Sequence, residues 1–318
     1  MVPETNGPDI CHSISHRNLK QKNNNKHLRY YYMILMLNGF MEKLLAGKWI
    51  AGPTVDDAIA RGERFKKIGI GAIFNYLGEA LTNNNDIEEA TNVYLDIIGK
   101  INAGDEKCQI SIKPTQIGMS LGVDAAKQNL EKIVNKANEK NIFTWIDMEE
   151  SEFIDKTIDL YRSQISKGNV GLCVQSYLRR TLKDVEDLSK EGGIFRLVKG
   201  AYTEDEKIAF KTKEEINKNF EDILIFMFQN TKNFMVASHD ELMVEKAIKL
   251  SEEYKKEVWY AMLNGIRNQY LIDLQNRGKA AFSYIPFGKK WIQYSVRRMQ
   301  ESGHMSLLMK SMIHGQKV

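Results

Sequence analysis

Residues 123–175 decide the fold. They contain two helix-like stretches, VDAAKQNLEKIVNKANEK (123–140) and FIDKTIDLYRSQIS (153–166), and two short apolar runs, FTWIDM (143–148) and VGLCVQ (170–175). In the first stretch, apolar residues recur every three or four positions and give one apolar helix face, formed by Ala126, Leu130, Ile133, Val134 and Ala137. The short apolar runs that follow are typical of strands. Apolar strands that alternate with amphipathic helices predict parallel βαβ units.

The same alternation extends from residue 71 to the C-terminal region. Eight apolar runs are predicted as strands: Gly71–Leu77, Cys108–Lys113, Phe143–Met148, Val170–Gln175, Ile194–Lys199, Phe234–Ser238, Val258–Met262 and Ala280–Ile285. Helical stretches separate them, for example Glu88–Ala103, Val123–Glu139, Phe153–Ser166, Lys213–Asn230 and Glu241–Tyr254. Eight such units predict a (β/α)8 TIM-type barrel, whose usual length is about 250 residues. A doubly wound open sheet is the main alternative.

Composition divides the chain further. Residues 1–35 carry five basic and two acidic residues, and the remainder carries 40 basic and 39 acidic residues. The nearly neutral remainder argues against nucleic-acid binding. We expect residues 1–35 to be a disordered tail, because the stretch from Arg17 to Arg29 is rich in Asn and Lys and almost without apolar residues. Residues 36–70 are predicted to form an N-terminal helical segment, and residues 71–318 the barrel domain.

Cysteines and histidines predict neither disulfides nor a metal site. The three cysteines have no paired spacing, and Cys108 and Cys173 lie in strand-like runs, which predicts buried free thiols. The six histidines lack a zinc-binding spacing.

Polar residues stand at or near the carboxyl ends of several predicted strands. They are Lys113, Asp147, Gln175, Arg196, Lys199, His239 and Tyr284. Catalytic groups of (β/α)8 barrels lie at these strand ends. A single buried lysine is usually part of a structural ion pair, but polar groups on so many strands predict a site at the mouth of the barrel.

The C-terminal region adds an arginine doublet. Tyr284-Ile-Pro-Phe-Gly288 is followed by Trp291, Tyr294, Arg297-Arg298 and Glu301. Adjacent arginines can hold a small carboxylate through paired hydrogen bonds, and aromatic side chains can close over an apolar ring. Tyr294 and Arg298 are four residues apart and share a helix face. The pattern predicts a pocket for an amino or imino acid, with a solvated helix face as the alternative.

These segments, in this order, resemble proline dehydrogenase along residues 71–301, in its compact prokaryotic monofunctional form. The motifs that carry the resemblance are Arg196-Leu-Val-Lys-Gly-Ala-Tyr202, Tyr284-x-Pro-x-Gly288, Arg297-Arg-x-x-Glu301, Ile146-Asp-Met-Glu-x-Ser151 and Gln175-x-Tyr-x-x-Arg180. Two departures stand out. Ala237-Ser-His-Asp240 replaces the more usual Thr-His and Asn, and Pro114 follows Lys113, where it is expected to alter the backbone locally.

The resemblance implies oxidation of L-proline to Δ1-pyrroline-5-carboxylate by hydride transfer to FAD, the first step of proline catabolism. It implies a flavin site formed by Met148, Gln175, Arg196, Val198, Lys199, Gly200, Ala201, Ser238 and His239. A cation such as Arg196 would tune the flavin electrostatically, and the alternative for Arg196 is an interior salt bridge with Asp147 or Glu149. Asp147 matches the family's active-site aspartate, and we expect it to orient Lys113 more than to take a proton.

The resemblance also implies the substrate site and the partners. Lys113, Arg297 and Arg298 would bind the carboxylate, and the ring pocket would be shaped by Tyr202, Leu263, Tyr284 and Tyr294. Electrons would pass to a membrane quinone, which would make the protein a peripheral membrane protein. The expected location is the cytoplasm, with peripheral association with the inner face of the cytoplasmic membrane as an option. Alternatives are a hydroxyproline dehydrogenase, a Schiff-base aldolase using Lys113 or Lys199, and a non-enzymatic binding barrel. A nicotinamide site has little support, because Gly69-Ile-Gly71 lacks the third glycine.

Overall fold

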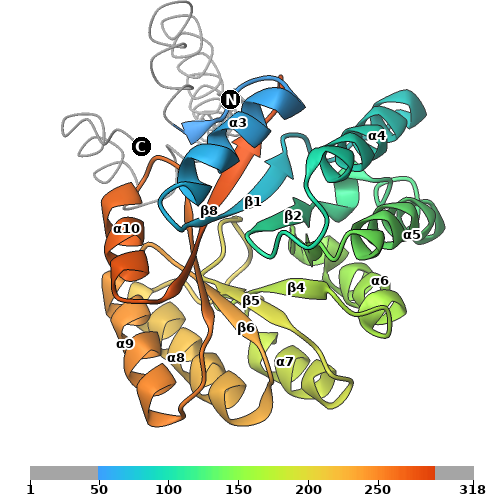
Figure 1. The fold of residues 1–318 in the computed structure, drawn as a ribbon. Helices are drawn as coiled ribbons and strands as arrows, with labels where there is room; N and C mark the ends of the chain where they lie inside the picture. The colour runs from blue at the N-terminus through green and yellow to red at the C-terminus, as the bar shows by residue number, and fades with distance from the viewer. Residues whose placement is uncertain (1–48, 291–318) are drawn as a thin grey trace, which may run out of the picture. The chain divides into compact units, whose positions relative to one another are not determined.

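The structure is a computed structural model that describes residues 49–290. Within these residues, eight parallel strands close into a barrel in chain order, and helices surround it (Figure 1). The strands are β1 Gly71–Tyr76, β2 Cys108–Ile112, β3 Phe143–Ile146, β4 Val170–Gln175, β5 Phe195–Val198, β6 Phe234–Ala237, β7 Trp259–Leu263 and β8 Ala280–Phe287. Each predicted run overlaps a strand, with β7 and β8 ending one and two residues later than predicted, so the predicted (β/α)8 barrel is confirmed.

Closure of the barrel excludes an open sheet. The first and last strands pair directly, from Gly71 with Phe282 to Tyr76 with Phe287. The segment before the helix Val55–Lys66 is hydrogen-bonded to the end of β8. The Ala51 amide donates to the Pro286 carbonyl at 2.9 Å, and the Gly288 amide, just after β8, donates to the Gly52 carbonyl at 2.9 Å.

The helices follow the predicted pattern. They are α3 Val55–Lys66, α4 Asn84–Lys100, α5 Val123–Glu139, α6 Ile154–Ile165, α7 Thr181–Lys190, α8 Lys213–Asn230, α9 Glu241–Glu253 and α10 Asn268–Asn276, with short 3-10 turns η1 Pro114–Gln116 and η2 Ser151–Phe153. Capping boxes define two of the starts. In α8, the Glu215 amide donates to the Thr212 hydroxyl at 3.2 Å, and the Thr212 amide donates to the Glu215 carboxylate at 3.2 Å, which satisfies two amides that the helix cannot pair.

The apolar faces build the core. All five residues of the predicted apolar face of α5 are completely buried. The amino end of the barrel is filled by aromatic rings, among them Phe143 and Trp145 with ring centroids 4.7 Å apart and Trp259 5.3 Å from Phe143. Cys108 and Cys173 are buried free thiols, as predicted. The aromatic layer closes the amino end of the barrel.

Several predictions concern residues beyond the described range. The proposed tail (1–35), the start of the N-terminal helical segment (36–48) and the C-terminal residues 291–318 lie outside the described residues, so the division of the chain into these parts stays a prediction. Helix α3 lies within the segment predicted to be helical. Across residues 49–290, none of the helices has the length and apolar character needed to cross a bilayer.

Candidate active site

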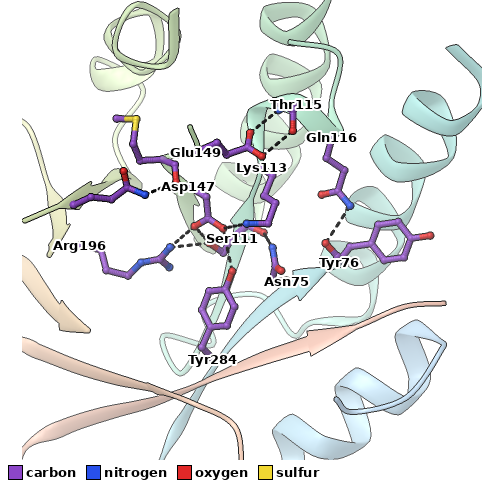
Figure 2. Close-up of polar contacts among 12 residues, drawn as sticks. Asn75, Tyr76, Ser111, Lys113, Thr115, Gln116, Asp147, Glu149, Arg196 and Tyr284 are labelled. Carbon is purple, nitrogen blue, oxygen red and sulfur yellow. Dashed lines mark hydrogen bonds and ion pairs between the residues drawn. The ribbon is translucent and has the colours of Figure 1, made fainter. Parts of the chain in front are cut away.

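A buried carboxylate, Asp147, lies at the centre of the carboxyl end of the barrel (Figure 2). It directly follows β3 and accepts hydrogen bonds from three other strands. Ser111 Oγ from β2 donates to its Oδ1 at 2.7 Å, the Tyr284 hydroxyl from β8 donates to its Oδ2 at 3.0 Å, and Arg196 Nη2 from β5 donates to Oδ1. Arg196 Nη2 also contacts Ser111 Oγ at 3.1 Å. Side chains that are far apart in sequence thus meet in one hydrogen-bonded cluster.

The cluster carries two cations around this carboxylate. Lys113 Nζ lies 3.4 Å from Asp147 Oδ2, and Arg196 makes the closer ion pair with Oδ1. Burial by itself would raise the pKa of Asp147, but Lys113 and Arg196 hold that pKa below its usual value of 3.8. Burial would lower the pKa of Lys113, but Tyr202 and Asp147 hold it well above its usual 10.5. All three side chains are therefore charged near neutral pH.

Arg196 occupies a position between two aromatic rings. Its guanidinium carbon lies 5.3 Å from the ring centre of Trp145 and 5.3 Å from that of Tyr284, a cation–π arrangement. The alternative interpretation of Arg196, an interior ion pair with Asp147, is confirmed as a contact. The guanidinium makes this ion pair through Nη2. Arg196 Nη1 is buried and has no hydrogen-bond partner among residues 49–290.

Residues predicted to bind a cofactor line the ends of β4 and β5, which pair with each other. Gln175 is the last residue of β4. Its Nε2 donates to the Met148 carbonyl at 3.2 Å, while its buried Oε1 has no partner within the described part of the chain. After Val198, the last residue of β5, Lys199 Nζ binds Asp240 Oδ2 at 2.5 Å.

The loop after β5 begins with a constrained glycine. Gly200 has a φ of +108°, and a Cβ added there would lie 2.1 Å from Cδ1 of the Tyr177 ring. Glycine is therefore required both by the backbone conformation and by the packing. Ala201 and Tyr202 follow in the same loop and are half-buried.

The remaining candidates lie beside β6 and β7. Ser238 Oγ accepts the Asp240 amide at 3.1 Å, and His239 Nε2 accepts the amide of Leu263, the last residue of β7, at 3.3 Å. This contact ties the predicted cofactor residue His239 to the predicted substrate residue Leu263. Asp240 also caps α9, since its Oδ1 accepts the Leu242 amide at 3.1 Å. The change from the family's usual Asn thus keeps a capping oxygen.

Each predicted site residue within 49–290 comes from the strands or the strand-end loops that form this mouth. Lys113, Asp147, Lys199 and Ser238 follow a strand directly. Gln175, Val198 and Leu263 are the last residues of β4, β5 and β7, and Arg196 and Tyr284 lie inside β5 and β8. Three predicted substrate residues, Tyr294, Arg297 and Arg298, lie outside the described residues. In the described part, no group of three or more His, Cys, Asp or Glu side chains is arranged to hold a metal ion.

Comparison with known proteins assigns the family. The family model described as proline dehydrogenase matches residues 58–311. The chain belongs to the proline dehydrogenase family. It is 30% identical to proline dehydrogenase 2 of Bacillus subtilis strain 168 over 285 residues, which cover 86% of this chain and 94% of that protein. It is also 30% identical to proline dehydrogenase of Deinococcus radiodurans over 268 residues, 81% of this chain and 86% of that protein. Family membership makes the protein an oxidoreductase.

Solved structures agree on the fold. Proline utilization A from Bdellovibrio bacteriovorus, in a crystal structure of the enzyme inactivated by N-propargylglycine, superposes with a TM-score of 0.74 at 21% identity. The match covers 86% of this chain but only 36% of that longer protein. At this identity the likeness concerns the barrel alone.

Two residues of the cluster, Glu149 and Thr115, were not among the predicted site residues. Glu149, two residues after Asp147, is buried, and its carboxylate accepts the Thr115 amide at 2.8 Å and the Thr115 hydroxyl at 2.7 Å. Burial raises the pKa of Glu149, although Lys113 and the Thr115 hydrogen bonds oppose this. The sequence did contain a signal for Glu149. In an extended segment, residues two positions apart point to the same face, so the spacing alone favours a shared face for Glu149 and Asp147.

Pro114 changes the backbone less than its position suggests. It is the first residue of η1, where a missing amide hydrogen costs nothing, and Lys113 before it is extended at φ −91° and ψ 125°. The departure at residue 114 therefore leaves Lys113 directed into the cluster.

Proposed function

We propose that the protein oxidises L-proline to Δ1-pyrroline-5-carboxylate, the first step of proline catabolism, with FAD as cofactor and a quinone as electron acceptor. The observation that carries the proposal is the buried cluster of Lys113, Arg196 and Asp147 next to Tyr284, at the mouth of a barrel of this family. It combines a cation for a substrate carboxylate with polar groups suited to a redox cofactor.

The residues present fit a flavin. Arg196 Nη1 is a buried donor and Gln175 Oε1 a buried acceptor on adjacent strands, and neither atom has a hydrogen-bond partner among the described residues, although the Arg196 guanidinium also interacts with the Cys173 thiol. Buried polar groups almost always find a partner, and a planar ring with donors and acceptors along its edge would supply both. Further contacts would come from Met148, Val198, Lys199, Gly200, Ala201, Ser238 and His239. When bound, FAD accepts the hydride equivalent released by substrate oxidation.

The substrate carboxylate would be bound by Lys113 together with Arg297 and Arg298. The ring would lie among Tyr202, Leu263, Tyr284 and Tyr294. Because the Tyr284 hydroxyl is held by Asp147 at 3.0 Å, its ring is fixed and leaves less room for a ring hydroxyl, which favours proline over hydroxyproline. A Schiff-base mechanism at Lys113 loses support, since it needs a neutral amine and the pKa of Lys113 is held well above its usual value, by Tyr202 and Asp147 against burial.

Asp147 would act as a positioning group rather than as a base. Its two oxygens already accept three hydrogen bonds and pair with Lys113, and its pKa is lowered by Lys113 and Arg196 in spite of burial. Such a carboxylate is a weak proton acceptor. Proline would therefore react as the neutral amine, its nitrogen proton already released to solvent. The ring carbon beside nitrogen, on the side away from the carboxylate, would then lose hydride as the C=N bond forms, and the remaining proton on nitrogen would leave to solvent to give the imine.

The acceptor and the location follow from the family resemblance. We infer that the electrons leave to a quinone, from a cytoplasmic protein associated peripherally with the inner face of the cytoplasmic membrane. Rapid reduction of a short-chain quinone by proline-reduced protein would support this, and reduction of molecular oxygen alone would contradict it.

An anaerobic absorbance titration tests the central proposal. The purified protein, reconstituted with FAD, should show a flavin band in the blue that bleaches on addition of L-proline, with formation of the imine product. A protein that binds no FAD, or whose flavin band persists with proline, would overturn the proposal.

A further inference from the structure

The turn after β2 is tied to both neighbouring strand ends through one residue, Thr115. Its amide and hydroxyl donate to the two oxygens of Glu149 after β3, at 2.8 Å and 2.7 Å. Its hydroxyl accepts the Ala80 amide at 2.8 Å, and its carbonyl accepts the Leu81 amide at 3.2 Å, both from the loop after β1. Thr115 and Glu149 are only 2% and 3% exposed, so water cannot replace these hydrogen bonds.

This arrangement fixes the backbone of Lys113. Pro114 separates Lys113 from Thr115 and restricts the residue before it to extended conformations. The Lys113 carbonyl accepts the Gln116 amide at 3.0 Å, which closes the turn. The loop on the other side is under strain, because Ala80 holds a φ of +51°, a left-handed conformation that non-glycine residues rarely adopt. The Ala80 hydrogen bond to Thr115 opposes release of that strain.

The arrangement also keeps the carboxylate of Glu149 from the ammonium of Lys113. The two side chains lie next to each other (Figure 2), close enough for each to influence the other's pKa. Both oxygens of Glu149 are nevertheless used by Thr115, and within residues 49–290 the ion-pair partner of Lys113 Nζ is Asp147 at 3.4 Å. Since Asp147 is bound more closely by Ser111 and Arg196, the ammonium keeps donors for a ligand.

We propose that Thr115 and Glu149 are positioning residues for Lys113: Thr115 holds the Glu149 carboxylate away from the lysine ammonium, so that the ammonium remains available to the substrate carboxylate. The proposal rests on the proposed oxidation of proline. Without the Thr115 hydroxyl, the Glu149 Oε1 atom loses its hydrogen bond and can turn to Lys113 and neutralise it, even though the Thr115 amide still binds Oε2.

The test compares Thr115→Val, which removes the hydroxyl at nearly constant volume, with Thr115→Ser, which keeps it. Both are assayed as FAD-loaded protein with L-proline and with pyrrolidine, which lacks the carboxylate, and for inhibition by cyclopentanecarboxylate. Thr115→Val should raise the KM for proline and the inhibition constant about tenfold, as expected for loss of ground-state binding. Its kinetics on pyrrolidine, and those of Thr115→Ser on proline, should stay within about twofold of the wild type.

A double variant separates the two parts of the proposal. Thr115→Val with Glu149→Gln has no charge that can neutralise Lys113, so its KM for proline should fall back toward the wild-type value. If Thr115→Val does not accumulate as folded protein, Thr115→Cys, which keeps a weak donor, should show a smaller shift in the same direction. Equal losses on proline and pyrrolidine, or a Thr115→Ser defect as large as that of Thr115→Val, would show a purely structural role and overturn the proposal. A wild-type protein that does not oxidise proline would instead refute the proposed function.

Discussion

Replacing Asp147 by Asn keeps the shape of the side chain and removes the charge that faces Arg196 and Lys113. The surrounding groups would remain, with Ser111 Oγ at 2.7 Å, the Tyr284 hydroxyl at 3.0 Å and Lys113 Nζ at 3.4 Å. The buried Arg196 and the partly buried Lys113 would, however, lose their counter-charge. The amide nitrogen of the new Asn would also face donors. We expect Asp147→Asn to be strongly destabilising.

The magnitude follows from burial. Asp147 and Arg196 are 5% and 3% exposed, so solvent screens their interaction weakly. Removing one partner of a buried ion pair costs about 3–5 kcal/mol, because the remaining charge is left uncompensated. For a domain of this size, 1 kcal/mol corresponds to roughly 2–4 °C in Tm. The variant should therefore melt roughly 6–20 °C below the wild type.

The assay is thermal unfolding of wild type and Asp147→Asn, with the same excess of FAD so that ligand binding contributes equally. Asp187→Asn is the matched control. Asp187 lies on the surface with two lysine partners at 2.9 Å and 3.1 Å, and exposed pairs contribute little, so its Tm should not change measurably.

The pH dependence gives an independent check. Lys113 and Arg196 lower the pKa of Asp147 in the folded protein, against the effect of burial. A lowered carboxyl pKa stabilises the fold fully above the unfolded-state pKa, and this stabilisation is lost as the pH falls through the folded-state pKa. The Tm difference between wild type and variant should be constant around neutral pH and shrink below about pH 4. A variant that melts within about 2 °C of the wild type at neutral pH would refute this account of the cluster.

Three further predictions concern other parts of the site. Arg297→Met or Arg298→Met should raise the KM for proline roughly tenfold to over a hundredfold, since a hydrogen bond to a charged group contributes about 1.5–3 kcal/mol, with little change on pyrrolidine; equal losses on both substrates would make the doublet structural. Gly200→Ala should lower Tm and FAD content, because its φ is +108° and the new Cβ would lie 2.1 Å from the Tyr177 ring; unaltered melting and flavin absorbance would count against it. Removal of residues 1–32 should leave proline oxidation and Tm unchanged, and loss of folded protein in that truncation would show that the tail packs.

The barrel was predictable because its pattern is local. Strand and helix periods can be read over a few residues, and the predicted bounds of β4, α5 and α8 agree with the structure residue by residue. The predicted end of β8, Ile285, falls two residues short of the end in the structure, so that Pro286 lies inside the strand although proline is rare within sheets. The structure shows why Pro286 is tolerated. The pairing of β7 with β8 ends at Leu263 and Tyr284, so at Pro286 β8 no longer pairs with β7.

The site was predictable as a set of residues but not as a set of contacts. Strand ends and family motifs identified Asp147, Lys113 and Arg196, because residue type and position along a strand are visible in sequence. The Thr115 hydrogen bonds to Glu149 were not predicted, because they join residues 34 positions apart through particular rotamers. Sequence could not show either that Arg196 would bind Asp147 through Nη2 and leave Nη1 without a hydrogen bond among the described residues.

Closure of the barrel by its first and last strands has a consequence for biogenesis. The chain emerges from the ribosome N-terminus first, at about 5–20 residues per second, so β1 must wait for β8, whose Phe282 pairs with Gly71. Tyr284 likewise reaches Asp147 across 137 residues. Until then β1 and β7 are each paired on one side alone, and their outer edges are open to association with other chains. Nascent chains that stall before residue 280 should therefore be the species that chaperones bind and that aggregates contain.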